Sequence, residues 1–283
     1  MSFNIPQFPL ARMIDVGLDW LTTHFSFITK ALSHAISIAI EAVTQALLWL
    51  PPWLLIMAVA LIGWRVAGRR VGLFCAVGLL FIWNLRLWPE TVETFTLVLI
   101  STVISVAIGL PLGIAAALNS KVSKVVMPTL DVMQTMPAFV YLIPAIPFFG
   151  LGAVSASVAT VIFATPPTIR LTALGIRQVP NDLIEAADAF GSTSRQKLFK
   201  VQLPMATPTI MAGINQTIML SLSMVVIAAM IGAGGLGGKV WQAIQRLEPG
   251  KGFAAGIAIV ILAIILDRIT QRIGRPPSST TAK

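Results

Sequence analysis

Long apolar stretches, separated by short charged or turn-rich segments, run through most of the chain. Residues 94–118 and residues 210–238 contain no charged side chain. About 20 consecutive apolar residues suffice for a helix to cross the hydrocarbon core of a bilayer, so each stretch predicts a transmembrane helix. The whole pattern predicts about seven such helices, over residues 46–64, 71–88, 94–118, 130–150, 157–178, 210–232 and 253–273.

A different pattern precedes the first predicted span. Apolar side chains recur at alternating steps of four and three residues from Ile14 to Ala39, and polar side chains occupy the other faces. This predicts an amphipathic helix that lies on the outer membrane interface or packs on neighbouring spans. An additional span over residues 25–45 would bury Lys30 and other ionisable side chains, so we do not expect one.

Composition agrees with a membrane protein and excludes several other classes. Of the 283 residues, 56% are hydrophobic and 11% are charged, and the mean hydropathy is +0.86. The apolar residues form long blocks rather than short alternating strands, which favours an all-α integral membrane fold over a β-barrel. Cys75 is the only cysteine, so no disulfide framework or cysteine zinc site is expected within the chain.

Basic residues mark the predicted topology. The chain has 20 Lys and Arg against 11 Asp and Glu, and its formal net charge is +9. The basic clusters lie at the ends of apolar segments and are not interleaved with aromatic residues, so nucleic acid is not an expected partner. If spans alternate, the basic residues of 65–70, 121–124, 170–200 and 268–283 share one side. The positive-inside rule then predicts an external N-terminus and a cytoplasmic C-terminus.

The predicted organisation has four parts. An extracytoplasmic amphipathic segment, 1–45, precedes two accessory transmembrane helices within 46–93. A core follows at 94–273, with a long cytoplasmic connection at about 179–208. Residues 274–283 are rich in Pro, Ser and Thr and predict a disordered tail.

The connection over residues 179–208 is too patterned for a passive loop. Asp182 and Glu185 have the spacing of a capping box and predict the start of a short helix. Gly191 predicts its end, since glycine readily adopts the left-handed backbone of a helix C-cap.

A second short helix is predicted immediately afterwards. Ser192 or Ser194 is expected to cap its N-terminus, and Pro204 is expected to end it before the next span. A compact pair of helices with a small-residue face is suited to fit a groove of a partner protein.

Residues 185–204, EAADAFGSTSRQKLFKVQLP, resemble the EAA signature of the permease subunits of ABC importers. The spacing of Glu-Ala-Ala, Gly and Leu-Pro agrees, and only Val201 departs, where the signature has isoleucine. The resemblance implies that this segment is the coupling helix that docks into a separate ATPase subunit. The residues it assigns to that coupling are Glu185, Ala186, Ala187, Gly191, Leu203 and Pro204.

Residues 94–273 are similar to the permease core of the glycine betaine, proline betaine and choline importers. The resemblance includes LDVMQTMPAFVYLIPAIPFFG, VIFATPPTIRLTALGIRQVP and GINQTIMLSLSMVVIAAMIGAGGLG. It implies the type I importer fold in the bacterial cytoplasmic (inner) membrane, with lipid around it. It also implies two copies of this chain, two copies of a partner ATPase and a separate periplasmic or extracytoplasmic substrate-binding protein. ATP and Mg²⁺ then bind the ATPase, and this chain holds no cofactor or metal and catalyses no reaction.

Several side chains in the spans are candidates for the substrate pathway. Aromatic faces attract quaternary ammonium groups, and methionines suit an adaptable lining. The candidates are Met133, Met136, Phe139, Tyr141, Asn215 and Met219. Packing between helices explains each of them equally well or better.

Charged residues in the spans have simple structural explanations. Asp131 is expected to cap the start of the fourth span, and Asp267 to pair with Arg268 near the inner end of the last span. No chain of acidic residues remains for proton coupling, which weakens the alternative of an ion-gradient-driven secondary transporter of small organic solutes. Gly232-Ala233-Gly234-Gly235-Leu236-Gly237 matches G-x-G-x-x-G only by chance, since it follows a span and not a strand.

Overall fold

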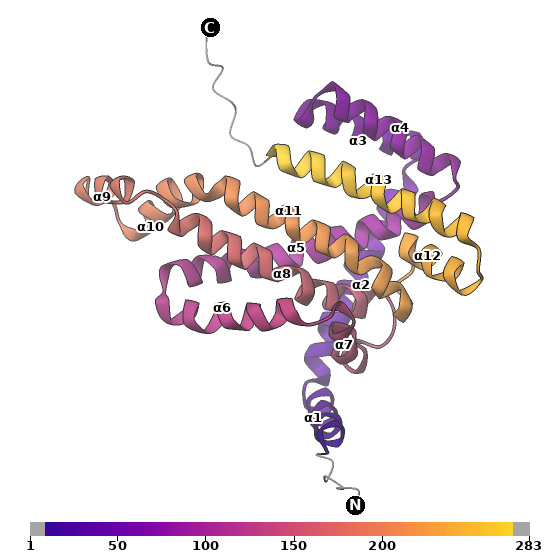
Figure 1. Ribbon diagram of the computed structural model, residues 1–283, viewed down its shortest axis with the longest axis horizontal. Coiled ribbons are helices and arrows are strands. Elements are labelled where there is room, and N and C mark those ends of the chain that lie inside the picture. Colours follow the sequence, from indigo (N-terminus) through magenta and orange to yellow (C-terminus); the bar gives the residue numbers. More distant parts are fainter. Residues whose placement is uncertain (1–8, 274–283) are drawn as a thin grey trace, which may run out of the picture.

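The computed structural model describes residues 9–273, and within this range every regular element is a helix. Figure 1 shows a bundle of long helices with short helices at its two ends. The long helices are α2 (Ser26–Trp49), α5 (Trp88–Leu118), α8 (Ala153–Arg177), α11 (Leu203–Ala228) and α13 (Pro249–Ile273). The shorter helices are α1 (Leu10–His24), α3 (Pro52–Ala67), α4 (Arg69–Asn84), α6 (Ser120–Thr135), α7 (Leu142–Phe149), α9 (Asn181–Ala189), α10 (Ser194–Lys197) and α12 (Gly235–Gln245). Three further turns are η1 (Ala138–Tyr141), the π-helical η2 (Leu198–Gln202) and η3 (Ala229–Ile231).

The centre of the bundle is formed by α5, α8 and α11, which pack closely against one another. Glycines allow this close approach. A Cβ built on Gly113 of α5 would lie 2.6 Å from Thr172 Cβ and 2.7 Å from the Ile169 carbonyl oxygen of α8. A Cβ on Gly213 of α11 would lie 3.0 Å from Leu171 Cβ. Small residues therefore set the spacing of these helices, as is usual where there is no hydrophobic force between spans.

Hydroxyl groups join the same three helices. Ser101 and Ser157 share a hydrogen bond of 3.0 Å between α5 and α8, and Thr168 and Thr217 share one of 2.8 Å between α8 and α11. Thr217 Oγ1 also lies 2.8 Å from the Ala164 carbonyl oxygen. These side chains are buried, so each bond satisfies a polar group that neither lipid nor apolar neighbours could satisfy.

Five described helices are long and apolar enough to cross a membrane, or six if the bent pair of α6 and α7 counts as one span. The predicted all-α membrane fold is thus confirmed, with fewer full-length spans than the expected seven. The additional long helix is α2, over a region where no span was expected. Figure 1 shows α2 running across the other long helices rather than along them.

The first predicted span, residues 46–64, is wrong as a single helix. Helix α2 ends at Trp49 and α3 begins at Pro52. Leu50 has an extended backbone (ψ 136°) because a residue that precedes proline avoids the helical region. Helices α3 and α4 then form a hairpin that reverses at Gly68 and packs on α13.

The fourth predicted span, residues 130–150, is also wrong as a continuous helix. It is divided between α6 and α7, which meet at an angle of 113°. Met136 and Pro137 both have extended backbones, with ψ of 134° and 141°. The proline has no N–H for the helix and restricts the residue before it, so its presence is compatible with the end of α6 at this point.

Two basic clusters predicted to share one side do lie together. Ala67 and Val71, which flank Arg69 and Arg70, line the same small recess as Arg268 and Arg272 at the end of α13. This end of the bundle also carries α9 and α10, and α12 lies at the opposite end (Figure 1). The predicted tail, 274–283, lies outside the described residues.

Candidate functional site

Helices α9 and α10 project from one end of the bundle (Figure 1). They are connected by the turn of residues 190–193, and we call residues 181–202 the coupling knob. The turn closes through three backbone bonds: Phe190 N–H to the Ala186 carbonyl, Gly191 N–H to the Asp188 carbonyl and Ser192 N–H to the Ala187 carbonyl. Gly191 has a φ of +71°, so the predicted glycine break with a left-handed backbone is confirmed.

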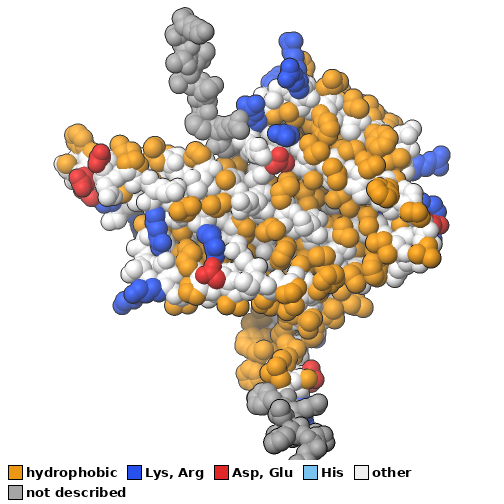
Figure 2. Space-filling view, in the orientation of Figure 1, with side chains coloured by type: hydrophobic (Ala, Val, Ile, Leu, Met, Phe, Trp, Pro, Cys, Tyr) orange, Lys and Arg blue, Asp and Glu red, His pale blue; other side chains and the backbone are white. Residues whose placement is uncertain are grey.

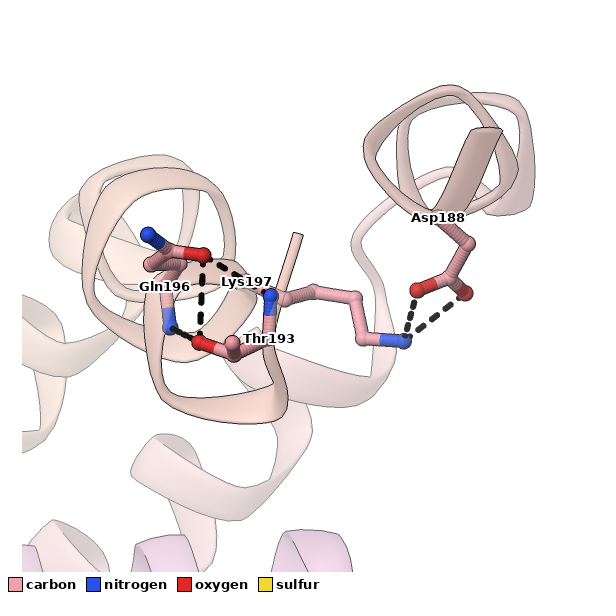
Figure 3. Close-up of polar contacts among 4 residues, drawn as sticks. All are labelled: Asp188, Thr193, Gln196 and Lys197. Atoms are coloured by element: carbon pink, nitrogen blue, oxygen red, sulfur yellow. Dashed lines mark hydrogen bonds and ion pairs between the residues drawn. The ribbon is translucent and has the colours of Figure 1, made fainter. Parts of the chain in front are cut away.

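The capping box lies one helix later than predicted. Helix α9 begins at Asn181 behind Pro180, and no side chain caps it, so the expected box of Asp182 and Glu185 is wrong. The box belongs to α10 instead, where Thr193 N–H donates to Gln196 Oε1 at 2.8 Å and Gln196 N–H donates to Thr193 Oγ1 at 3.3 Å (Figure 3). Asp182 and Glu185 remain on the exposed surface of α9. The N-cap residue, Pro180, has no side-chain oxygen, and only its backbone carbonyl accepts a bond, from Leu183 N–H.

An ion pair fastens the two short helices together. Lys197 Nζ lies 2.7 Å and 2.8 Å from the two carboxylate oxygens of Asp188, and Figure 3 shows Lys197 reaching from α10 toward α9. Sequence reasoning missed this pair because its two residues lie nine positions apart across the turn, a spacing that no single helix brings together. The pair and the capping box hold the coupling knob in one shape.

The second short helix does not end at Pro204. Helix α10, the π-helical turn η2, α11 and η3 follow one another without a break over Ser194–Ile231. Pro204 lies in the first turn of α11, where a missing N–H is tolerated, and the π turn precedes it. The coupling knob is therefore continuous with a span of the central bundle. Its movement can pass directly into the membrane part.

The exposed surface of the coupling knob includes apolar side chains that sequence reasoning did not single out. Glu185 and Ala186 are exposed, whereas Ala187 is buried at the base of α9. Phe190 is 91% exposed and Phe199 64%. Two exposed aromatic side chains on a projection from the bundle are typical of a surface that another protein covers.

The candidate pathway residues divide into two groups. Tyr141 is buried, its hydroxyl donates to the Met133 carbonyl, and its ring packs edge-on against Phe163 with centroids 5.6 Å apart. Met136 and Met219 likewise pack against the main core. Tyr141 is thus closed to a solute in this conformation, whereas Met136 and Met219 are half-buried. Phe139, by contrast, is 52% exposed.

Asn215 also has a structural partner. Its Nδ2 donates to Asp267 Oδ1 at 2.8 Å and so connects α11 with α13. Asp267 accepts a second bond from Gln271 Nε2 at 2.6 Å and lies 3.9 Å from Arg268 Nε, which confirms the predicted pair. This cluster holds the C-terminal part of α13 against α11.

A bundle of long apolar helices with a projecting pair of short helices is the arrangement expected of the membrane subunit of a transporter that works with a partner protein. Residues 109–276 match the family described as "Binding-protein-dependent transport system inner membrane component". The chain belongs to this family, and it is a multi-pass permease subunit of the inner membrane.

Curated relatives match nearly the whole chain. It is 54% identical to glycine betaine/carnitine transport permease protein GbuB of Listeria monocytogenes, over 98% of this chain and 99% of the relative. It is 52% identical to glycine betaine transport system permease protein OpuAB of Bacillus subtilis, over 95% and 96%. It is 48% identical to glycine betaine/proline betaine transport system permease protein ProW of Escherichia coli, over 98% of this chain and 78% of the relative.

Solved structures agree on the fold. An inward-facing structure of the MetNI methionine ABC transporter has a TM-score of 0.62 and 25% identity, over 66% of this chain and 94% of that chain. The permease core therefore has the type I ABC importer fold, as the EAA signature implied.

Proposed function

We propose that the chain forms the translocation pathway of an ATP-driven importer for quaternary ammonium compounds such as glycine betaine, proline betaine or choline. The observation that carries this proposal is the match, at 48–54% identity over almost the full chain, to permeases named for betaine transport. Carnitine belongs to the same chemical class and appears in the name of one relative. A separate extracytoplasmic binding protein delivers the solute.

The coupling knob connects this pathway to the energy source. Two copies of a partner ATPase bind ATP and Mg²⁺, and each receives the knob of one of two copies of this chain. Glu185, Ala186 and the backbone break at Gly191 shape the docking face, and Leu203 and Pro204 pass its movement into α11. The exposed rings of Phe190 and Phe199 support this assignment, because docking would remove them from water.

The proposed orientation places the coupling knob in the cytoplasm, the C-terminus on the same side and the N-terminus outside. The basic residues near Arg69 and Arg268, which share one end of the bundle, support it through the positive-inside rule. Lipid surrounds the outward surface, where large apolar side chains such as Leu73 and Phe253 are exposed.

The substitution Gly191→Arg tests the coupling. A Cβ at this position meets no atom within 4 Å, but its φ of +71° strains any residue other than glycine, and the long cation projects from the docking face. Gly68→Arg is the matched control, because Gly68 also has positive φ (+96°) and open space but lies in the α3–α4 turn. We expect Gly191→Arg to abolish uptake at equal membrane abundance, and Gly68→Arg to leave most of it.

The measurement combines purification and titration. The tagged chain is purified from native membranes in mild detergent, and the proteins that travel with it are identified. We expect a stoichiometric ATPase that is lost with Gly191→Arg and kept with Gly68→Arg, and a binding protein that titrates with glycine betaine. Uptake that survives ATP depletion and collapses with the ion gradient would instead establish the secondary transporter.

A further inference from the structure

A charged pair lies between α6 and α8, in the membrane part of the molecule. Arg170 Nη2 lies 2.5 Å from Asp131 Oδ1, and the two side chains are 39% and 66% exposed. Asp131 is inside α6 and is not the helix cap that the sequence analysis expected. Arg170 Nε is buried and has no hydrogen-bond partner among residues 9–273. The pair therefore retains donor and acceptor capacity that the chain itself does not use.

The position of Arg170 along α8 argues against a simple interfacial salt bridge. Helix α8 has 25 residues, which makes it about 37 Å long, against roughly 30 Å for the hydrocarbon core. Arg170 precedes the end of α8 at Arg177 by about 10 Å of helix. With α8 centred on the bilayer, Arg170 lies within the hydrocarbon thickness, where charged side chains face protein or water and mark functional positions.

The surface around the pair differs from a lipid-facing surface. Helix α6 carries Lys121, Lys124 and Asp131, and Leu130 is its only fully buried residue. In Figure 2 acidic and basic side chains lie side by side over α6 and α8, amid few hydrophobic ones, whereas the region over α12 and α13 is largely hydrophobic. Lipid suits the second region and water or polar solute the first.

A neighbouring residue, Arg177, already fastens α6 and α8 together, so the pair is not needed for that purpose. Arg177 Nη2 donates to the Ala116 carbonyl at 2.5 Å and to Ser123 Oγ at 2.8 Å, which fastens α8 to the end of α5 and the start of α6. Tyr141 binds the Met133 carbonyl at the other end of α6. Asp131 and Arg170 lie between these two attachments.

We propose that Asp131 and Arg170 form a contact site in the passage for a solute that carries both a carboxylate and a quaternary ammonium group. The guanidinium takes the solute carboxylate in place of Asp131, through its planar fork of donors. The released Asp131 carboxylate attracts the solute's cation. The pair closes again when the solute leaves, so neither charge stays unpaired at either stage. This inference rests on the proposed function and adds a preference to it: betaines engage both residues, whereas choline, without a carboxylate, does not engage Arg170.

Access from water is the first test. Cys75 is buried and is the only cysteine, so Cys75→Ala gives a background in which Gln134→Cys introduces a single exposed thiol one helical turn beyond Asp131. Val77→Cys is the control, since Val77 is 58% exposed on apolar α4. In the assembled importer we expect charged thiosulfonate reagents, one with a trimethylammonium group and one with a sulfonate, to modify position 134 but not position 77.

The rate of the same thiol-labelling reaction also reports the charge near Asp131. Adding Asp131→Asn should lower the rate with the trimethylammonium reagent relative to the sulfonate reagent by about fivefold, as expected of one unit charge some 8 Å away between water and protein. Glycine betaine should protect Gln134→Cys, and choline at the same concentration should protect it less. A thiol at position 134 that neither reagent reaches, or equal protection by both solutes, would overturn the proposal.

Uptake by the complete importer in liposomes is the second test. Arg170→Gln should reduce glycine betaine uptake by about tenfold or more, the loss expected for one charge-assisted hydrogen bond. ATPase stimulation by the loaded binding protein should persist. Arg170→Lys should recover part of the uptake, and Arg177→Gln should cost less uptake than Arg170→Gln.

The outcomes separate the two proposals. If the unsubstituted importer does not take up betaine, the proposed function fails. If it does, and Arg170→Gln transports normally or Arg177→Gln impairs uptake as much, the pair is only a fastening between helices and the contact site is rejected.

Discussion

Helix α8 and the α6–α7 segment both contain prolines at membrane depth, yet only one of them breaks. Helix α8 continues from Ala153 to Arg177 through Pro166 and Pro167, whereas α6 and α7 meet at 113° beside Pro137. The difference lies in their surroundings. Of the most apolar window of α8, 72% is buried, between α5 and α11, whereas α6 buries only Leu130.

Close packing on both sides holds α8 straight through its two prolines, whereas few neighbours hold α6. Proline alone does not decide, since Pro128 lies inside α6 without breaking it. The molecule consequently combines a tightly packed layer of α5, α8 and α11 with a weakly held α6 on its polar side. The coupling knob is continuous with the packed layer through α11. A displacement of the knob therefore moves α5, α8 and α11 together, whereas α6 can move relative to them.

The largest effect is expected from Gly113→Leu, which overpacks the contact between α5 and α8 in the central layer. Even a Cβ at this position would lie 2.6 Å from Thr172 Cβ and 2.7 Å from the Ile169 carbonyl oxygen, which is backbone and cannot move aside. We expect a loss of stability of about 3 kcal/mol or more, with much of the protein lost from the membrane. Thermal unfolding in detergent, followed by size-exclusion chromatography, measures it.

Gly256→Leu is the matched control in α13, where a Cβ meets no atom within 4 Å. It should keep a nearly unchanged unfolding temperature. Equal damage from both substitutions would show that any leucine at a span glycine is harmful and that packing of α5 on α8 is not the cause.

Much of this fold could be predicted from the sequence, because the bilayer demands long apolar helices and the pattern records them directly. The same holds for the coupling knob, since Gly191 and the EAA spacing are local features. Local rules also predicted the residue at which α9 ends, since Gly191 has the positive φ that was expected there.

Errors arose where tertiary contacts decide. The breaks at Leu50 and Pro137 fall inside apolar runs that hydropathy alone reads as continuous, and Pro166 shows that a proline does not by itself predict a break. The pairing of Asp131 with Arg170 spans 39 positions, so no local pattern predicts it, and a cap was the simplest local explanation.

A medium effect is expected from Thr217→Val, which removes a hydroxyl from the packed layer without changing side-chain shape. Thr217 Oγ1 lies 2.8 Å from both Thr168 Oγ1 and the Ala164 carbonyl oxygen, so its loss leaves buried groups with fewer partners. We expect a cost of about 1 kcal/mol. Thr207→Val is the control, because Thr207 is exposed on the same helix. Among the described residues its hydroxyl donates only to the Leu203 carbonyl, one turn earlier in that helix. A control that costs as much would argue against a special role for the buried hydroxyls.

The smallest effect on stability is expected from Pro137→Ala. This substitution tests directly whether the proline or the packing beyond it bends the α6–α7 segment. If surroundings decide whether a helix bends, alanine at this position should keep the bend, because Tyr141 and Leu142 just beyond it are anchored in the core. Removing the proline should cost about 0.5 to 1 kcal/mol, through the greater freedom of the unfolded chain. Spin labels at Val125 and Ile143, which are 69% and 62% exposed, report the distance between α6 and α7 in a Cys75→Ala background. We expect the same mean distance with and without the proline. A clear lengthening would show that Pro137 itself, rather than the packing beyond it, bends this segment.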